Sequence, residues 1–261
     1  MSIPAPEIPP VPADLGRMRW GRALRALRAL LADPDDTAKA IEVTLSIGAR
    51  DFERSFQRFA ATAEGRALLA ERPSLAAALS DRASLAQMDP ESLGRGYLAY
   101  LERTGFTTTG LLELQDATQA RWEREEGFPP MDALRAWYRD RWLLVHDLLH
   151  IVTGYDTDDL GEAALLAFSQ PQIRGRANAL LTAGATFEVF RVLGPSWLVY
   201  QFRAWRRGGR AVPVIALPWE ELLPLRVATV RRIARVGEPA ETHRRGILTG
   251  RRVAEHGYTL R

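Results

Sequence analysis

The stretch that decides the fold is residues 132–162, which read DALRAWYRDRWLLVHDLLHIVTGYDTDDLGE. Over residues 132–152 its apolar side chains recur every three to four positions and form a nearly continuous stripe of Leu134, Trp137, Tyr138, Trp142, Val145 and Leu149. This is the period of an α-helix with one buried face. Gly154 is a common helix-ending residue, and the polar residues at 156–159 can cap a second helix that runs to about Phe168. The stretch therefore predicts two helices joined by a tight turn.

Helical periods also occur on both sides of this stretch. They predict further helices over residues 14–33, 35–70, 177–192 and 218–236. Between them, Pro171 is expected to interrupt a helix, residues 203–210 to form a basic turn, and residues 212–215 to form a short strand that Pro213 would confine to a sheet edge. The chain shows no alternation of strands and helices, no fixed repeat and no glycine-rich phosphate loop. The predicted fold class is all-α, a single compact multi-helix domain with room for one short hairpin.

Composition divides the chain into three parts. Residues 1–13 are proline-rich and are predicted to be a disordered tail, residues 14–236 form the helical domain, and residues 237–261 form a polar, arginine-rich C-terminal tail. Of the 261 residues, 46% are hydrophobic and 26% are charged, as in an ordinary globular protein. The absence of cysteine excludes disulfides, thiolate catalysis, cysteine-based zinc fingers and iron–sulfur clusters.

The net charge and the N-terminal segment indicate where the protein acts. The formal charge of +3 permits contact with an anionic surface without requiring it. No apolar stretch reaches the roughly 18 residues that a membrane-spanning helix needs. The first sixteen residues lack the basic start and apolar core of a secretory signal, and Glu7, Asp14 and the early prolines disfavour a mitochondrial presequence. We expect a bacterial cytoplasmic protein.

The first predicted helix carries five arginines between positions 17 and 28, opposite a leucine face. Two interpretations stay open at this stage. The helix can pack on the core and expose a solvated arginine face, or it can lie on an anionic membrane surface.

The strongest chemical signal is the pair His146 and His150 on the best-predicted helix. A spacing of four residues turns a side chain by about 40° and advances it by about 6 Å, so both imidazoles can reach one ion, as in H-E-x-x-H zinc helices. Glu162, in the first turn of the returning helix, is the expected third ligand, and Asp147 can ligate or act from just behind the ligands. The set predicts a zinc-type or non-haem iron-type site. The alternative is a pair of interior histidines hydrogen-bonded to carboxylates.

The two remaining histidines, His243 and His256, lie in the polar tail and are expected to be solvated.

The spacing His146-Asp147-x-x-His150, followed after eleven residues by Glu162, resembles the signature of the ubiquinone (coenzyme Q) biosynthesis protein four family. The match also places Thr153-Gly154 and Gly161 as the family does. Weaker similarity to that family extends over roughly residues 40–236, through these segments: Glu64-Gly65-Arg66 to Arg72-Pro73, Ser92-Leu93-Gly94 with Tyr97, and Trp219-Glu220. The chain resembles a bacterial member of the family. The segments before and after this region look like additions.

The resemblance implies an all-α fold, frequent homodimers and a zinc ion held by His146, Asp147, His150 and Glu162. It also implies peripheral attachment to the inner membrane, where polyprenylated quinone precursors or other prenyl lipids and other quinone-biosynthesis proteins are found. The implied activity is removal of the ring carboxylate at C1 of a polyprenylated hydroxybenzoate, with hydroxylation at that carbon. The same four residues are then the catalytic candidates, with Asp147 as general base if it does not ligate. Iron or manganese are alternatives to zinc.

Such chemistry suits the predicted site. A metal with an open position can bind a substrate carboxylate or phenolate and stabilise charge on the ring. Zinc does not change oxidation state, so the redox step would fall to the ring and dioxygen. A prenyl tail needs an apolar channel, and the following aromatic residues could line it or simply be core: Trp142, Phe168, Phe187, Phe190 and Trp197.

The alternatives to this enzyme are a scaffold, a zinc hydrolase of another kind and a nucleic-acid-binding protein. A non-catalytic lipid-binding scaffold with a structural metal fits the same residues. A zinc peptidase would carry Glu in place of Asp147, and an H-D phosphohydrolase would need a further distant histidine and aspartate. Arginines are spread along the chain without a recognition motif, so no nucleic-acid partner is expected.

Overall fold

The computed structural model describes residues 8–11, 15–127 and 130–237. Asp14 and most of the proline-rich segment lie outside the described residues, as does the C-terminal segment 238–261 with both of its histidines. The predicted division of the chain at residues 13 and 236 therefore stays a prediction.

Within the described residues the chain forms fourteen α-helices and one 3₁₀ turn, with no β-strand; Ser92 and Arg226 form an isolated antiparallel bridge. The helices are α1 (Trp20–Ala32), α2 (Thr37–Ile47), α3 (Ala49–Ala60), α4 (Ala63–Glu71), α5 (Leu75–Ser80), α6 (Arg82–Gln87), α7 (Leu93–Thr104), α8 (Gly110–Glu126), α9 (Ala133–Thr153), α10 (Asp159–Ile173), α11 (Arg176–Leu193), α12 (Pro195–Arg210), η1 (Val214–Ala216), α13 (Trp219–Leu222) and α14 (Val227–Ala234). The predicted all-α class is confirmed.

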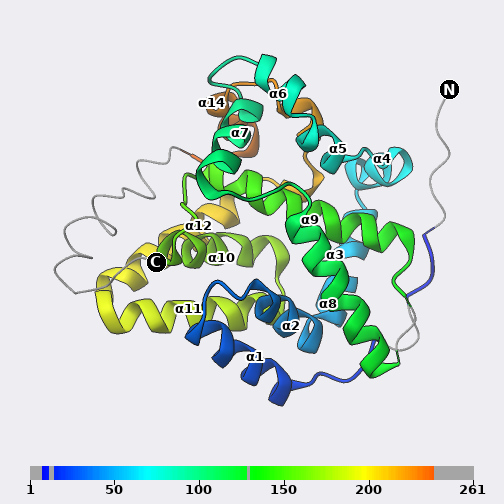
Figure 1. The fold of residues 1–261 in the computed structure, drawn as a ribbon, viewed down its shortest axis with the longest axis vertical. Coiled ribbons are helices and arrows are strands. Elements are labelled where there is room, and N and C mark those ends of the chain that lie inside the picture. Colours follow the sequence, from blue (N-terminus) through cyan, green and yellow to red (C-terminus); the bar gives the residue numbers. More distant parts are fainter. Residues whose placement is uncertain (1–7, 12–14, 128–129, 238–261) are drawn as a thin grey trace.

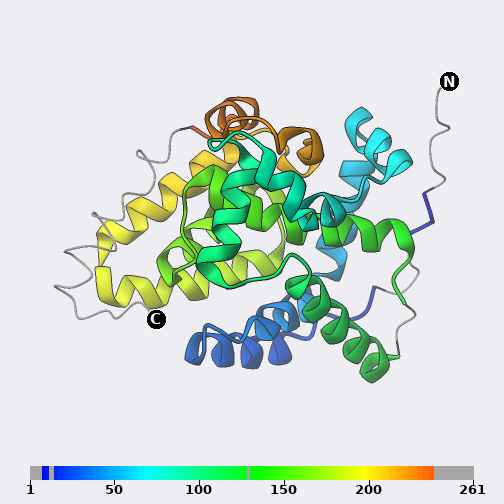
Figure 2. The same ribbon diagram turned by 45° about the horizontal axis from the view of Figure 1, so that its top comes forward.

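Helix α9 is the centre of the arrangement. It crosses the middle of the molecule and contacts α5, α7, α8, α10, α14 and the turn η1 (Figure 1). Helices α10, α11 and α12 pack on one another beside it, and α1 and α2 pack against α11 (Figures 1 and 2). The predicted stripe of α9 supplies buried residues to two core clusters, and Phe56 and Phe59 join Tyr138 in the second of these. No helix among the described residues is long and apolar enough to cross a membrane.

Two of the predicted long helices are divided in the structure. The expected helix over 35–70 is three helices, α2 to α4: Gly48 lies at the break between α2 and α3, and the Thr62 side chain caps the start of α4 by accepting a hydrogen bond from the Gly65 N–H. The expected last helix is the short α13 and α14. Between them the chain turns away to accept backbone hydrogen bonds from Leu93 and Gly94 at the start of α7, at 2.8 Å each. Long-range backbone pairing thus overrides the local helical period.

Three local predictions near the C-terminal half were wrong. Pro171 does not interrupt a helix, because α10 continues past it to Ile173. Residues 203–210 are the last two turns of α12, not a loop. The expected strand at 212–215 is replaced by the 3₁₀ turn η1, whose Val214 N–H donates to the Gln172 side chain and whose Val214 carbonyl accepts from the Trp219 indole. Side-chain partners satisfy the backbone that a strand would have paired.

Gly208 explains why a glycine-containing segment stays helical. Helices α10 and α12 approach so closely there that a Cβ at Gly208 would lie 1.9 Å from the Phe168 carbonyl oxygen, which is backbone and cannot move aside.

We expect Gly208→Ala to lower the free energy of unfolding by about 1–3 kcal/mol through overpacking. The matched control is Gly209→Ala, whose Cβ would meet only Pro171 at 3.8 Å. It should be neutral or stabilising by up to about 1 kcal/mol. Urea unfolding of both variants gives the test, and equal stabilities would contradict the close contact.

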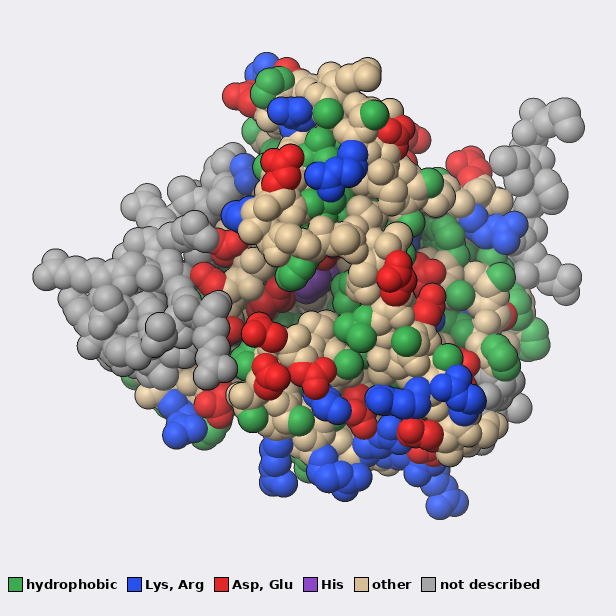
Figure 3. Space-filling model, in the orientation of Figure 1, with side chains coloured by type: hydrophobic (Ala, Val, Ile, Leu, Met, Phe, Trp, Pro, Cys, Tyr) green, Lys and Arg blue, Asp and Glu red, His purple; other side chains and the backbone are tan. Residues whose placement is uncertain are grey.

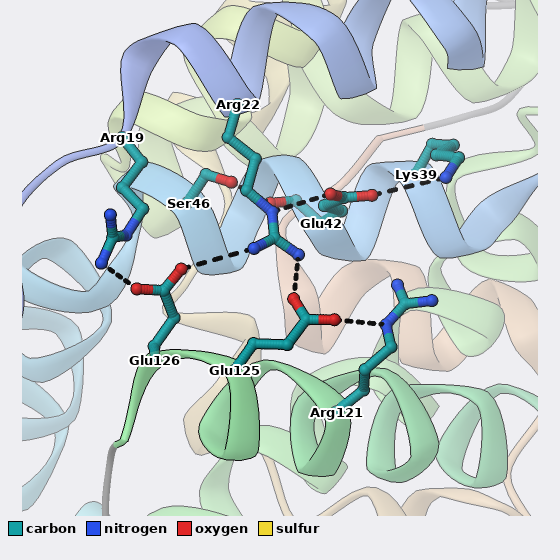
Figure 4. A network of polar contacts seen from close by, with 8 residues as sticks. All are labelled: Arg19, Arg22, Lys39, Glu42, Ser46, Arg121, Glu125 and Glu126. Atoms are coloured by element: carbon teal, nitrogen blue, oxygen red, sulfur yellow. Dashed lines mark hydrogen bonds and ion pairs between the residues drawn. The ribbon is translucent and has the colours of Figure 1, made fainter.

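Helix α1 packs on the core rather than standing free. Ala23, Ala26 and Leu27 are buried against α2 and α11. Arg22 forms ion pairs with Glu42 of α2 at 2.8 Å and Glu125 of α8 at 2.9 Å, within a polar network joining the three helices: Arg19, Arg22, Lys39, Glu42, Ser46, Arg121, Glu125 and Glu126 (Figure 4). Two of the arginines that a membrane surface could have attracted are therefore engaged within the protein.

Candidate metal centre

The C-terminal end of α9 is fixed by two buried or half-buried arginines from other helices. Arg207 of α12 donates to the Thr153 carbonyl at 2.7 Å, and Arg231 of α14 donates to the Val152 carbonyl at 2.9 Å. Cations at this end also interact favourably with the helix dipole. Gly154 then adopts the left-handed conformation, with φ of 76°, and ends the helix as predicted. The last turn of α9, which carries His150, is thereby held in one place.

The start of α10 is fixed by an equally tight turn. Asp158 caps the helix by accepting a hydrogen bond from the Gly161 N–H at 2.7 Å. A Cβ at Gly161 would lie 1.9 Å from the Asp156 carbonyl oxygen, so only glycine allows the loop to fold this closely over the helix. Glu162 follows in the first helical turn and faces back toward α9, as the sequence predicted.

His146, His150 and Glu162 come together in the structure. The Glu162 carboxylate oxygens lie 3.1 Å from His150 Nε2 and 3.5 Å from His146 Nε2, and the two imidazole Nε2 atoms are 3.3 Å apart. A tetrahedral zinc ion with ligands at about 2.0–2.1 Å holds its ligand atoms about 3.3 Å apart. Two imidazole nitrogens and one carboxylate oxygen at these separations fit a zinc ion. They are also the donor set of non-haem iron sites.

A further contact orients His150 for such a role. Its Nδ1–H donates to the Tyr155 carbonyl at 3.1 Å, which leaves Nε2 as the free nitrogen on the side of Glu162. This is the arrangement by which metal-binding histidines are commonly held from behind. His150 is almost fully buried, whereas the side chains of His146 and Glu162 are 33% and 41% exposed. One side of the group therefore remains accessible.

The charges of the group reinforce one another. Burial by itself would raise the pKa of Glu162, but the two imidazoles beside its carboxylate hold that pKa well below its usual range. Burial by itself would lower the pKa of His150, but the Glu162 carboxylate outweighs it and raises that pKa. A bound divalent cation would replace the proton on the imidazoles as the positive charge that stabilises the Glu162 carboxylate.

Asp147 lies beside the group but faces another partner. Its carboxylate is buried and accepts a hydrogen bond from the Tyr100 hydroxyl of α7 at 3.3 Å. Burial raises the pKa of this carboxyl, and the nearby imidazoles oppose that shift. The structure thus brings three of the four predicted residues to one point and places Asp147 behind them. The Tyr100 ring also stacks on the His150 imidazole, with ring centres 5.9 Å apart.

Three residues near the site were not singled out from the sequence: Tyr100, Tyr155 and Arg207. No spacing in the sequence links Tyr100 to the histidine pair, and the Tyr155 contact is made by its backbone. Nothing in the sequence links Arg207 to a carbonyl more than fifty positions away. Of the aromatic residues considered for a prenyl channel, Phe168 and Trp197 are fully buried in the core, whereas Phe187 is exposed.

The site lies in a hollow of the molecular surface. In the space-filling view a histidine side chain is visible inside the hollow near the centre of this face, with acidic side chains along one side (Figure 3). His146 and His150 are the histidines of the described residues, so the hollow leads to the candidate metal centre.

Comparison with known proteins tests the family resemblance that the sequence predicts. The model of the family "Coenzyme Q (ubiquinone) biosynthesis protein Coq4" matches residues 19–113, which end before the histidine pair. The chain is 29% identical to the mitochondrial ubiquinone biosynthesis protein COQ4 of Podospora anserina over 184 residues, 68% of this chain and 54% of that protein. It is 28% identical to the COQ4 homolog of Danio rerio over 181 residues, 67% of this chain and 60% of that protein. The chain thus spans less than two thirds of the length of these relatives.

The fold has a counterpart among solved structures. A crystal structure of a Nostoc punctiforme protein assigned to ubiquinone biosynthesis superposes with a TM-score of 0.59 at 18% identity, covering 85% of this chain and all of the other. That similarity establishes the shared fold alone. The family match over residues 19–113 and the curated relatives confirm the predicted resemblance: this chain is similar to the Coq4 family of coenzyme Q (ubiquinone) biosynthesis proteins.

Proposed function

We propose that the protein acts in ubiquinone biosynthesis as a zinc-dependent enzyme that removes the C1 carboxylate of a polyprenylated hydroxybenzoate. The observation that carries the proposal is the convergence of His146, His150 and Glu162, with candidate ligand atoms within 4.8 Å of one another. The relationship to the Coq4 family supports the pathway.

The number of ligands favours a catalytic ion over a structural one. Structural zinc sites commonly use four protein ligands, whereas catalytic sites use three and keep a position for water or substrate. Among the described residues the group has three members, and two of them are partly exposed. A scaffold protein with a closed structural site is the second candidate, and the exposure of Glu162 argues against it.

The residues of the chain divide the work as follows. His146, His150 and Glu162 would hold the metal, and Tyr155 would keep His150 in the required orientation. A bound zinc ion would supply Lewis acidity toward a carboxylate or phenolate oxygen of the substrate. Asp147, held by the Tyr100 hydroxyl, is the nearest carboxylate outside the ligand group and is our candidate for the general base.

The proposed reaction has a defined balance. The bond between ring carbon C1 and the carboxylate breaks, carbon dioxide leaves, and C1 gains a hydroxyl whose oxygen comes from water. This exchange is a two-electron oxidation of the ring, and dioxygen accepts the two electrons and the two protons released and leaves as hydrogen peroxide. Iron or manganese in the same site is the alternative if the metal itself takes part in electron transfer.

The place of action and the partners are part of the proposal. A prenyl tail keeps the substrate in a lipid bilayer, so we place the protein in the bacterial cytoplasm, bound peripherally to the inner membrane. Other quinone-biosynthesis proteins and a second copy of this chain are the proposed protein partners.

Release of the carboxylate tests the proposal directly. We expect zinc-loaded protein, mixed with vesicles that contain a prenylated hydroxybenzoate labelled in its carboxyl group, to release labelled carbon dioxide in air. The matched control is Glu162→Gln, which keeps the size of the side chain and removes its charge, and it should release none above background. A protein that binds zinc and the lipid but releases no label, with zinc or with iron, would contradict the enzyme and support the scaffold.

A further inference from the structure

Helix α12 carries an unusually apolar exposed face. Leu198, Val199, Phe202 and Trp205 are 47%, 53%, 56% and 45% exposed, and Phe187 of the neighbouring α11 is 59% exposed. Leu198, Phe202 and Trp205 follow one another at the i, i+4, i+7 spacing of one helix face. The rings of Phe202 and Trp205 stack with centres 5.9 Å apart. We call these five residues the α12 face.

The α12 face is bordered by positive charge. Arg203, Arg206 and Arg210 are exposed along the same helix, and none of them forms an ion pair with another described residue. Helix α12 contains no aspartate or glutamate. The Arg206 guanidinium lies over the Phe202 ring, 5.9 Å from its centre. Exposed Phe, Trp and Leu beside unpaired arginines are the composition of helices that lie in a membrane interface.

The orientation of α12 is imposed by its other side. Trp197, Ala204 and Gly208 are buried against the rest of the molecule, so the exposed residues cannot turn inward. The hairpin of α11 and α12 lies at one edge of the molecule in both ribbon views (Figures 1 and 2). Gln201, on the buried side, donates to the carbonyl of Ala163, the residue after Glu162, at 3.1 Å. Helix α12 therefore packs directly against α10, the helix that carries Glu162 of the candidate metal centre.

We propose that the α12 face docks on an anionic lipid bilayer, with its aromatic residues in the interface and its arginines at the headgroups. The inference rests on the peripheral membrane attachment proposed above and assigns that attachment to a surface. It also moves the attachment away from α1, whose Arg19 and Arg22 are engaged in ion pairs.

Charge separates this occupant from two others. A second copy docked through the same face by a two-fold axis would bring the arginines of both copies together, which is unfavourable. The segment 238–261 contains five arginines and three glutamates, so its net charge does not complement the arginines of α12. An anionic lipid surface does, and each arginine near such a surface contributes about 1 kcal/mol, or about a fivefold change in binding.

Vesicle flotation of the full-length protein tests the assignment. The probe is a vesicle of phosphatidylcholine with phosphatidylglycerol, compared with phosphatidylcholine alone. We expect the wild type to float with the anionic vesicles, Phe202→Ser with Trp205→Ser to lose at least about tenfold in binding, and Arg203→Gln with Arg206→Gln to lose about tenfold or more at low salt only. The matched control is Trp20→Ser with Leu24→Ser on α1, two apolar residues that are 44% and 42% exposed, and it should bind like the wild type.

Each outcome decides a separate point. Loss of binding in the α1 pair with retention in the α12 pair would overturn the proposed face and return the attachment to α1. A wild type that floats with neither vesicle would overturn membrane attachment itself. A dimer in sedimentation experiments that the Phe202 and Trp205 changes dissociate would assign the face to a second copy. Zinc content is measured on every variant and should stay unchanged, which separates failure of the docking face from failure of the metal centre.

Discussion

Replacing His150 with alanine is expected to abolish stoichiometric zinc binding. His150 is the most buried of the three candidate ligands, and its Nε2 lies 3.1 Å from the Glu162 carboxylate. Losing a group that merely orients a ligand already weakens metal affinity by about 10–100-fold, so losing the ligand itself should cost more than about a hundredfold. Metal analysis of protein purified with added zinc, together with competition against a chelator, measures the effect.

A neighbouring substitution separates loss of the ligand from loss of stability. Leu149→Ala, one position earlier on α9, removes a side chain that is 1% exposed and should lower the free energy of unfolding by about 2–5 kcal/mol. It leaves all three ligand side chains in place, so the folded protein should still bind one zinc. Equal zinc content in His150→Ala and the wild type would refute the metal centre, as would the absence of zinc from both.

The second large effect is expected at a buried ion pair far from the site. Arg135 of α9 donates two hydrogen bonds of 2.7 Å to the Glu53 carboxylate of α3, and both side chains are almost fully buried. Arg135→Met would leave the Glu53 charge buried without its partner, which should lower the free energy of unfolding by about 3–5 kcal/mol. The control is Arg139→Met, whose partners Asp116 and Asp140 are 64% and 36% exposed, and it should change stability by less than Arg135→Met does, by about 1 kcal/mol.

The same pair gives a pH dependence with a defined sign. Burial by itself would raise the pKa of Glu53, but the hydrogen bonds from Arg135 and Gln57 outweigh it and lower that pKa. A carboxyl whose pKa is lower in the folded state stabilises the protein above the pKa of the unfolded state, and this contribution is lost as the pH falls toward the folded value. The stability difference between wild type and Arg135→Met should therefore shrink below about pH 5. A difference that stays constant from neutral pH to pH 4 in urea unfolding would contradict this assignment.

The sequence predicted the three candidate metal ligands but not the position of Asp147. The pair His146 and His150 and the return of Glu162 depend only on helical geometry and a glycine turn, so the sequence was enough to propose that they meet. The position of Asp147 could not be settled in the same way. It lies at the edge of the histidine face, and its contact with Tyr100 requires α7 to pack against α9, which no local pattern reveals.

The sequence by itself determined the helical class, the bounds of α9 and α11 to within a residue or two, and the turn at Gly154, because these depend on periodicity and capping within a few residues. Only the tertiary structure decided where the chain breaks and which surfaces remain exposed. Residues 203–210 look like a basic turn locally, yet Gly208 lets α12 pack against the Phe168 carbonyl and continue as a helix. That packing buries one side of α12 and leaves Phe202 and Trp205 in solvent, whereas Phe168 and Trp197 are enclosed in the core. The sequence alone does not show which Phe or Trp is buried and which is exposed, because their burial is set by the helices that pack over them.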